Sequence, residues 1–252
     1  MNLLWAPAII LPYLWLFQPV VPTCSSTNTP TAAALISDIK LPDGFERIPS
    51  LNNSFAAWLK ERRLKPDKTV FLYNGLPKRN QDAQYAVIDI STGNEDLQQC
   101  ADAVMRLRAE YLYANEKWAE IVFKDNANKA YYYQNGKDRA AFDRYLRKVF
   151  GWCGTASLEK QLRPVRNIKE IMAGDVFIKG GFPGHAVIVM DVAQNNRGEK
   201  IFLLAQGYMP AQDIHLLKNP KDQNRNPWYK ATENQLVITP EWTFQPSQLR
   251  RW

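Results

Sequence analysis

Three apolar runs between Gly174 and Tyr208 constrain the fold of this chain more than any other stretch. They read DVFI, HAVIVMDVA and KIFLLAQGY, and they have the length and composition of buried β-strands. The sequence GGFPG separates the first run from the second, and NNRGE between the second and the third is typical of a turn. The pattern predicts an antiparallel sheet, with DIHLL as a further short strand.

The segments before Gly174 have mainly helical patterns. SFAAWLKERRL is typical of a short helix capped by Ser54, and the apolar residues of LQQCADAVMRLRAEYLYA recur at helical spacing. Thr92 and Glu95 have the spacing of a capping box, so we expect this long helix to begin near Thr92. Two further helices are expected over DRAAFDRYLRKVFG and TASLEKQL.

Short strands are also expected upstream of the main sheet. VFLYNG (70–75) and AQYAVIDI (83–90) are predicted to pair as a hairpin, and IVFKDN and AYYYQNG to form two further strands. Because helices dominate the first part and an antiparallel sheet the second, the sequence predicts an α+β fold.

The N-terminal stretch is apolar and uncharged up to Val21. Pro7, Pro12 and Pro19 interrupt it, which argues against a lasting transmembrane helix and favours a signal peptide. The order VPTC followed by SSTNTPTAAA resembles a bacterial lipoprotein signal, in which Cys24 becomes the acylated first residue. Ordinary secretion with cleavage nearby is the alternative. In both cases we expect an exported protein of the cell envelope.

The expected organisation is a signal peptide over residues 1–23, a linker over 24–38 and one domain over 39–252. The net charge is +7, but no nucleic-acid motif accompanies the basic clusters, so we expect a solvated basic surface and no nucleic-acid partner. The two histidines lie far apart and no carboxylates cluster around them, so neither a metal site nor a cofactor is expected.

Cys100 and His185 are the residues best suited to nucleophilic chemistry. Cys100 shares the helix face expected to press on the sheet, where a thiol is either an inert buried residue or a nucleophile directed at a histidine. If the helix begins near Thr92, Cys100 lies one to two turns inside it, where the effect of the helix dipole has faded. His185 opens a strand that is apolar on both faces, and it is either a structural residue or a general base.

The expected hairpin offers His185 a partner. A turn centred near Asn195–Asn196 places His185 directly opposite Gln206, or opposite Tyr208 if the register slips by two. The amide oxygen of Gln206 would then orient the imidazole, with His215 as another alternative for this role. Cys100, His185 and Gln206 together have the pattern of nucleophile, base and orienting residue. Pairing of Cys100 with Cys153 in a disulfide is the alternative for the thiol.

A GDVF strand followed by GHAVIVM resembles the bacterial papain-like cell-wall hydrolases, the NlpC-type endopeptidases and CHAP amidases. The resemblance covers residues from about 92 to 210 and implies a papain-like fold with a helix bearing Cys100 packed on an antiparallel sheet. The resemblance also implies that Cys100, His185 and Gln206 catalyse the hydrolysis of an amide bond in peptidoglycan stem peptides. This chain differs from those families in two respects. The residues around Cys100 read LQQCAD where those families usually have DCSG, and the third catalytic residue is glutamine where histidine is more usual.

A wider resemblance covers nearly the whole chain after the N-terminal stretch. GFERIP, LQQCADAVMRLRAEYLYA, GDVFIKGGFPGHAVIVMDVA and TPEWTF are similar to a family of bacterial envelope lipoproteins of unknown function. Cys153 stands where that family commonly has alanine, which implies that a disulfide between Cys100 and Cys153 is not obligatory. Two functions remain open: an exported cysteine hydrolase acting on peptidoglycan or a related peptide, and a non-catalytic envelope lipoprotein that binds cell wall or a protein partner.

Overall fold

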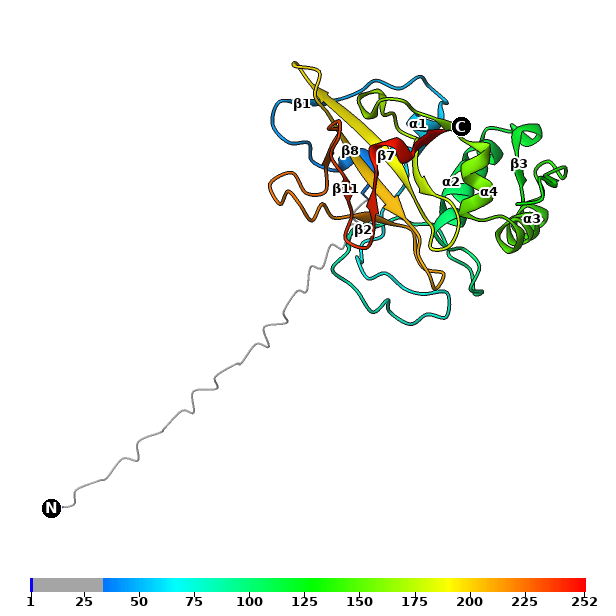
Figure 1. Ribbon diagram of the computed structural model, residues 1–252. Helices are drawn as coiled ribbons and strands as arrows, with labels where there is room; N and C mark the ends of the chain where they lie inside the picture. Colours follow the sequence, from blue (N-terminus) through cyan, green and yellow to red (C-terminus); the bar gives the residue numbers. More distant parts are fainter. Residues whose placement is uncertain (2–33) are drawn as a thin grey trace. The chain divides into compact units, whose positions relative to one another are not determined.

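The computed structural model describes Met1 and residues 34–252, and the compact unit spans Ala33–Trp252 (Figure 1). The expected signal peptide, the acylation site at Cys24 and residues 24–33 of the expected linker lie outside the described residues. Ile36 is fully buried in the core, so the packed part begins upstream of the expected boundary at residue 39.

The fold is α+β and is built on one large antiparallel sheet. Its strand order is β2 (Gln84–Val87), β9 (His215–Leu217), β8 (Lys200–Gln206), β7 (His185–Asn195), β6 (Val176–Lys179), β13 (Leu249–Arg251) and β5 (Arg163–Pro164). The short strands β1 (Phe45–Arg47) and β10 (Tyr229–Lys230) pair with β7 and β8. Two smaller hairpins join β3 (Val122–Lys124) to β4 (Ala130–Tyr132) and β11 (Val237–Ile238) to β12 (Thr243–Phe244). The four strands expected after Gly174 are confirmed as β6, β7, β8 and β9.

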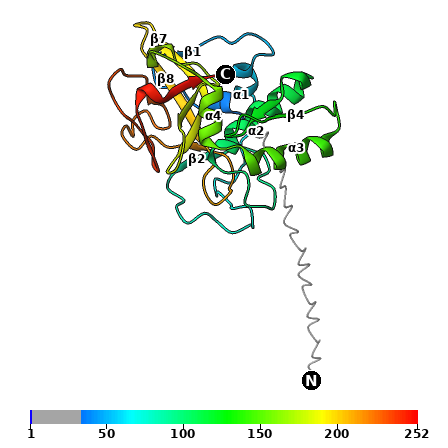
Figure 2. The same cartoon turned by 45° about the vertical axis from the view of Figure 1, so that its right-hand side comes forward.

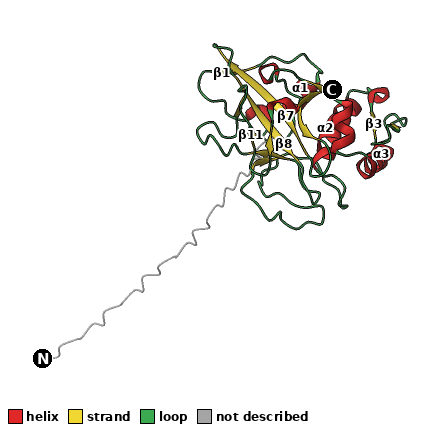
Figure 3. Cartoon of the chain, viewed as in Figure 1, coloured by secondary structure: helices red, strands yellow, loops and turns green. Residues whose placement is uncertain are grey.

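The helices α2, α3 and α4 lie together on one side of the long strands β7 and β8 (Figures 1, 2 and 3). The α-helices are α1 (Phe55–Lys60), α2 (Cys100–Ala114), α3 (Arg139–Trp152) and α4 (Thr155–Gln161). Within residues 34–252, 3₁₀ turns are formed by η1 (Ile36–Asp38), η2 (Trp118–Glu120), η3 (Ile168–Glu170) and η4 (Pro246–Gln248). As expected, Ser54 caps α1, since its hydroxyl accepts a 3.2 Å hydrogen bond from the N–H of Ala57.

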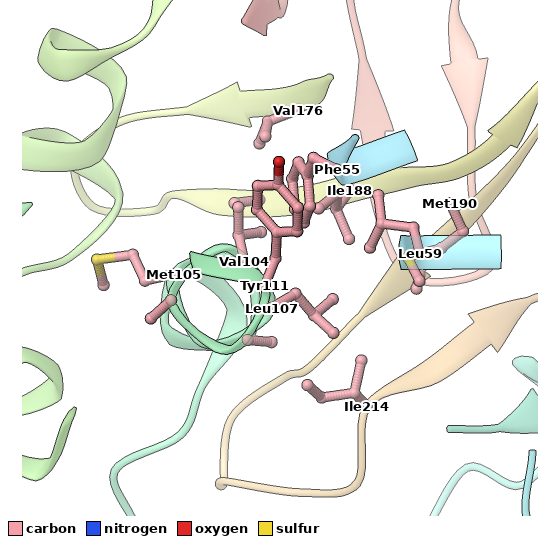
Figure 4. Close-up of a cluster of buried hydrophobic side chains, with 14 of the residues drawn as sticks. Phe55, Leu59, Val104, Met105, Leu107, Tyr111, Val176, Ile188, Met190 and Ile214 are labelled. Carbon is pink, nitrogen blue, oxygen red and sulfur yellow. The ribbon is translucent and has the colours of Figure 1, made fainter. Parts of the chain in front are cut away.

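Successive residues of β7 are buried in two different cores, which explains why this strand is apolar on both faces. Ala186, Ile188 and Met190 belong to the core shared with the helices. Val187 and Val189 belong to a second core on the opposite face of the sheet. Figure 4 shows part of the first core, in which α1, α2 and β7 meet through Phe55, Leu59, Val104, Leu107, Tyr111, Ile188 and Met190.

The expected hairpin between residues 70–75 and 83–90 is wrong. Strand β2 pairs with β9, and the segment 70–75 makes only isolated bridges, Phe71 with Pro77 and Leu72 with Gln212. The side chain of Gln81 supplies the reason, because it accepts from the N–H of Val70 at 3.1 Å and donates to its carbonyl oxygen at 3.0 Å. Both backbone groups of Val70, at the start of the segment, are therefore already paired and are not available to a neighbouring strand.

Candidate active site

Cys100 is the first residue of α2, which corrects the expected helix start near Thr92. Gln99 is the N-cap, and the carboxylate of Asp102 accepts a 3.0 Å hydrogen bond from the N–H of Gln99. The hydroxyl of Thr92 is used elsewhere, since it donates to Asp213 at 3.2 Å. Cys100 therefore stands at the positive end of the helix dipole, among N–H groups that have no partner within the helix.

A glycine brings the start of α2 against the end of β8. A Cβ atom on Gly207 would lie 2.9 Å from the carbonyl oxygen of Gln99 and 3.1 Å from the Cβ of Ala103. Such a contact is too close for any side chain, so this approach requires glycine. Asp96 strengthens it, because its carboxylate accepts a 2.6 Å hydrogen bond from the N–H of Ala211 in the loop after β8.

His185 is the first residue of β7 and hydrogen-bonds to Gln206, although the expected register is wrong. The ladder pairs Gln194 with Lys200 and Ile188 with Ala205, which would place Gln206 opposite Val187. The turn is centred further along the chain than Asn195–Asn196, and a bulge between Val189 and Asp191 offsets only one residue of the resulting shift. Gln206 is thus a diagonal neighbour of His185, and its long side chain still reaches the ring.

The surroundings of Gln206 fix both its own orientation and the tautomer of His185. One amide hydrogen of Gln206 points to Glu241, at 2.6 Å, and the other to the Nε2 of His215, at 3.3 Å. The Nδ1–H of His215 donates to the carbonyl oxygen of Asp213 at 2.9 Å, so its Nε2 is free to accept. The Oε1 of Gln206 therefore faces His185 and accepts from its Nε2–H at 2.8 Å. The Nδ1 of His185 keeps its lone pair.

Glu241 and Lys78 complete this network, and no sequence motif points to either residue. The Nζ of Lys78 lies 2.6 Å from the carboxylate of Glu241, and both side chains are largely buried. Asn80 also donates to Glu241, at 3.2 Å. These residues lie far apart in the sequence, in loops without a motif, so no local spacing connects them to Gln206.

Aromatic rings surround the imidazole of His185. Its ring centroid lies 5.0 Å from Tyr208, 5.3 Å from Trp242 and 5.9 Å from Phe244. Burial lowers the pKa of His185 to about 4, against the opposing effect of its bond to Gln206. His185 is therefore a neutral imidazole at neutral pH.

The thiol of Cys100 is protonated in the resting site. Burial first, and then the Asp102 carboxyl, raise the pKa of Cys100. Hydrogen bonds from the backbone N–H groups of Ala101 and Ala186 act in the opposite direction. Ala186 follows His185 directly, so the start of α2 lies against the start of β7, although no hydrogen bond joins Cys100 to His185 among the described residues.

Cys100 and His185 line one open cleft of about 460 Å³. The loop Gly181–Gly184 and the start of α4 line it, together with Tyr208, Met209 and Trp242. Phe182 at its rim is 95 % exposed and Met209 is 56 % exposed. The cleft thus offers a largely apolar surface next to a thiol.

Cys153 lines the same cleft, yet both cysteines of the described domain are free thiols. The alternative of a disulfide between Cys100 and Cys153 is therefore not realised in this structure. Burial raises the pKa of Cys153 to about 12, so this thiol is protonated at neutral pH.

Tyr208 and His215, the alternatives to Gln206 as the residue that orients His185, do not hydrogen-bond to the imidazole in this structure. Tyr208 packs edge-on against the ring of His185, and His215 contacts Gln206 rather than His185. Of the two glutamines that precede Cys100, Gln99 lines the cleft, whereas Gln98 is buried and its side-chain oxygen accepts a hydrogen bond from Arg106 at 3.3 Å.

Within residues 34–252 no three His, Cys, Asp or Glu side chains are grouped to hold a metal ion. No helix in this part of the chain has the length and apolar composition to cross a membrane.

Comparisons with known proteins give a family but no activity. No curated protein and no solved structure matches this chain. One family model, described as a domain of unknown function (4846), matches residues 35–137 and residues 124–251. Because these two segments together cover almost all of the described domain, the chain belongs to this family of domains of unknown function.

Proposed function

We propose that this protein is an exported cysteine hydrolase with a papain-like site, which cleaves an amide bond in a peptidoglycan stem peptide or a related envelope peptide. The observation that carries the proposal is the shared cleft. Cys100 at the first residue of α2 and His185 at the first residue of β7 line it together. Gln206 holds the imidazole in the tautomer that a general base requires.

The protonation states support a general-base mechanism. In the resting site both the thiol of Cys100 and the imidazole of His185 are neutral. As the sulfur of Cys100 bonds to the substrate carbonyl carbon, the Nδ1 of His185 takes the thiol proton. The sulfur and the nitrogen must come within hydrogen-bond distance for this step, a contact that often tightens only when substrate binds.

The remaining steps regenerate the site. The C–N bond breaks as His185 returns its proton to the leaving amine, and the acyl group stays on Cys100 as a thioester. A water molecule then attacks the thioester carbon while His185 takes one of its protons. The C–S bond breaks, the carboxylic acid leaves, and His185 returns the proton to the sulfur of Cys100, which restores the thiol and the neutral imidazole. The N–H groups at the start of α2 are the donors best placed to stabilise the oxyanion.

The choice of substrate rests on the sequence and on the cleft. The GDVF and GHAVIVM segments, which resemble cell-wall hydrolases, form β6 and the start of β7 beside the cleft. The apolar N-terminal stretch and the VPTC sequence favour export, with Cys24 as the site of a lipid anchor. The open cleft gives room for a peptide that remains attached to a larger polymer.

Digestion of purified peptidoglycan tests this function. The full chain is incubated with sacculi, and the soluble products are analysed by mass spectrometry. We expect products in which one amide bond has gained one water, and we expect Cys100→Ala to abolish them. Cys153→Ala is the matched control, because it removes the other thiol of the cleft. Equal products from the Cys100→Ala protein would exclude the proposal.

A second candidate function is a non-catalytic envelope protein that binds cell wall or a protein partner in the same cleft. The observation that favours it is the raised pKa of Cys100, since most active-site thiols have a lowered pKa. Sedimentation of the protein with sacculi that it leaves uncleaved, unchanged in Cys100→Ala, would support this function instead.

A further inference from the structure

Asp96 gives the cleft of Cys100 a charge that the proposed mechanism does not use. It lies in the turn before α2 and lines the cleft. One oxygen of its carboxylate accepts two hydrogen bonds, from the N–H of Ala211 at 2.6 Å and from the side-chain amide of Gln99 at 3.2 Å. The other oxygen has no hydrogen bond within residues 34–252, and the residue is exposed. The carboxylate is therefore fixed in position and accessible to a molecule in the cleft.

The lining of the cleft contains no cation that would neutralise Asp96. Among residues 34–252, no lysine or arginine lines it, and its other acidic residue, Asp102, is only 5 % exposed. Any charge on Asp102 has the same sign as that of Asp96. The partial positive charge at the start of α2 amounts to about half an elementary charge, so it does not cancel the carboxylate.

The cations of neighbouring elements do not change the sign of this charge. Lys179 pairs with His185 in the ladder, but it is exposed and does not line the cleft. Three further cations have acidic partners of their own: Lys78 pairs with Glu241, Arg147 with Glu95 and Arg250 with Glu159. The accessible charge in the cleft is thus negative, so it attracts an ammonium group and repels a carboxylate.

Apolar side chains line the cleft together with this carboxylate. Phe182 and Met209 both contribute to the lining and both are exposed. Met209 is two residues before Ala211, whose N–H binds Asp96. An aliphatic chain with a charged end can pack its stem on such a surface while the charge reaches a partner. Apolar contacts and one free carboxylate together fit an aliphatic primary amine better than an acidic or a purely apolar group.

We propose that Asp96 binds the ammonium group of an aliphatic amine on the substrate, so that the cleft selects peptides with a free primary amine near the scissile amide. This role of Asp96 rests on the proposed function, although binding of the amine does not itself require turnover.

Uncross-linked muropeptides whose diamino acid has a free amine test this role in three forms: unmodified, acetylated at the amine, and reductively dimethylated. Acetylation removes the positive charge, whereas dimethylation keeps the charge and one N–H donor. With the wild-type full chain, we expect acetylation to lower kcat/KM by roughly threefold to tenfold, as for an ion pair at an exposed position, and dimethylation to lower it by less. The difference between the unmodified and acetylated forms should shrink as ionic strength rises.

Asp96→Asn is the matched variant, because its amide oxygen can still accept from Ala211 while the charge is lost. We expect the ratio of kcat/KM for the unmodified and acetylated forms to fall to about one. The ratio is compared rather than the rate, because Asp96 also holds the loop after β8. Glu46→Gln removes an exposed acid outside the cleft and should keep the wild-type ratio.

The affinity of the Cys100→Ala protein for the three forms separates this role from the proposed function. If the wild type cleaves none of them, but Cys100→Ala prefers the unmodified form and a further Asp96→Asn removes that preference, the hydrolase fails and the amine site stands. If the wild type cleaves the unmodified and acetylated forms equally and Cys100→Ala binds them equally, the hydrolase stands and the amine site fails. A preference that survives in Asp96→Asn would also overturn the role of Asp96.

Discussion

The Nε2 of His185 donates a 2.8 Å hydrogen bond to the Oε1 of Gln206, and this contact determines which nitrogen of the imidazole is free to act as a base. Gln206 has no freedom to rotate its amide, because Glu241 and His215 accept its two hydrogens. Glu241 and His215 therefore set the tautomer of His185 through Gln206, without a hydrogen bond to the imidazole itself.

Glu241 is predicted to matter for activity through Gln206. In Glu241→Gln the new amide no longer offers two acceptor oxygens, so Gln206 loses its preferred orientation and His185 its fixed tautomer. We expect the kcat/KM of peptide hydrolysis to fall by roughly tenfold or more, mainly through kcat, since general-base catalysis contributes about a hundredfold or more.

Lys78→Met is the matched variant for this test. It removes the other member of the buried ion pair but leaves the acceptor of Gln206 in place. If Glu241→Gln and Lys78→Met lower kcat equally, the effect comes from the ion pair and not from the orientation of Gln206.

The pH dependence of hydrolysis should reflect the lowered pKa of His185. The base must be neutral, and burial lowers its pKa to about 4 from an ordinary value of 6.5. Activity should therefore persist as pH falls through 6.5 and should be lost only near pH 4. A profile of kcat/KM against pH checks this, and an acid limb near 6.5 would contradict the buried, neutral imidazole.

Gly207 is predicted to set the distance between α2 and β8. The Cβ added by Gly207→Ala would lie 2.9 Å from the carbonyl oxygen of Gln99 and would push Cys100 away from the cleft. We expect a destabilisation of about 1–3 kcal/mol and a loss of activity larger than the loss of folded protein explains. Thermal unfolding and kcat/KM are measured together.

Gly151→Ala is the control for this substitution. It adds the same methyl group in α3, where no atom lies within 4 Å, so both stability and activity should be kept. Equal behaviour of the two alanine variants would show that the close approach at Gly207 is not required.

The two thiols of the cleft should differ in reactivity. Both thiols line the cleft and the pKa of each is raised by burial, but Cys153 is only 6 % exposed and has a pKa of about 12, whereas Cys100 is half-buried and stands at a helix start. We expect iodoacetamide to modify Cys100 first, slowly at pH 7 and faster as pH rises. Peptide mapping after timed alkylation checks this, and faster modification of Cys153 would contradict the described cleft.

The sequence was sufficient to predict most elements of the fold. Strands β6 to β9 were predictable because their apolar runs are bounded by clear turn sequences, and Ser54 correctly marked the start of α1. The hairpin predicted between residues 70–75 and 83–90 was wrong. The side chain of Gln81 takes up the backbone hydrogen bonds of Val70, and the periodicity of the sequence does not reveal such a contact.

The contact between His185 and Gln206 was predictable, but the geometry of the elements that bring it about was not. The pair of His185 and Gln206 was anticipated, although the register was shifted, because a long amide side chain also reaches a diagonal neighbour. The start of α2 was misplaced because two capping spacings compete, and the one formed by Gln99 and Asp102 is used. Glu241 was missed because its contact with Gln206 joins loops distant in sequence.

Detection of an acyl group on Cys100 during turnover tests the central claim most directly. The full chain is mixed with muropeptides, quenched in acid within the first turnovers and digested for mass spectrometry. The proposed mechanism predicts a thioester on the peptide that contains Cys100, absent from Cys100→Ala and retained in Cys153→Ala. Hydrolysis that proceeds without this adduct and persists in Cys100→Ala would contradict it.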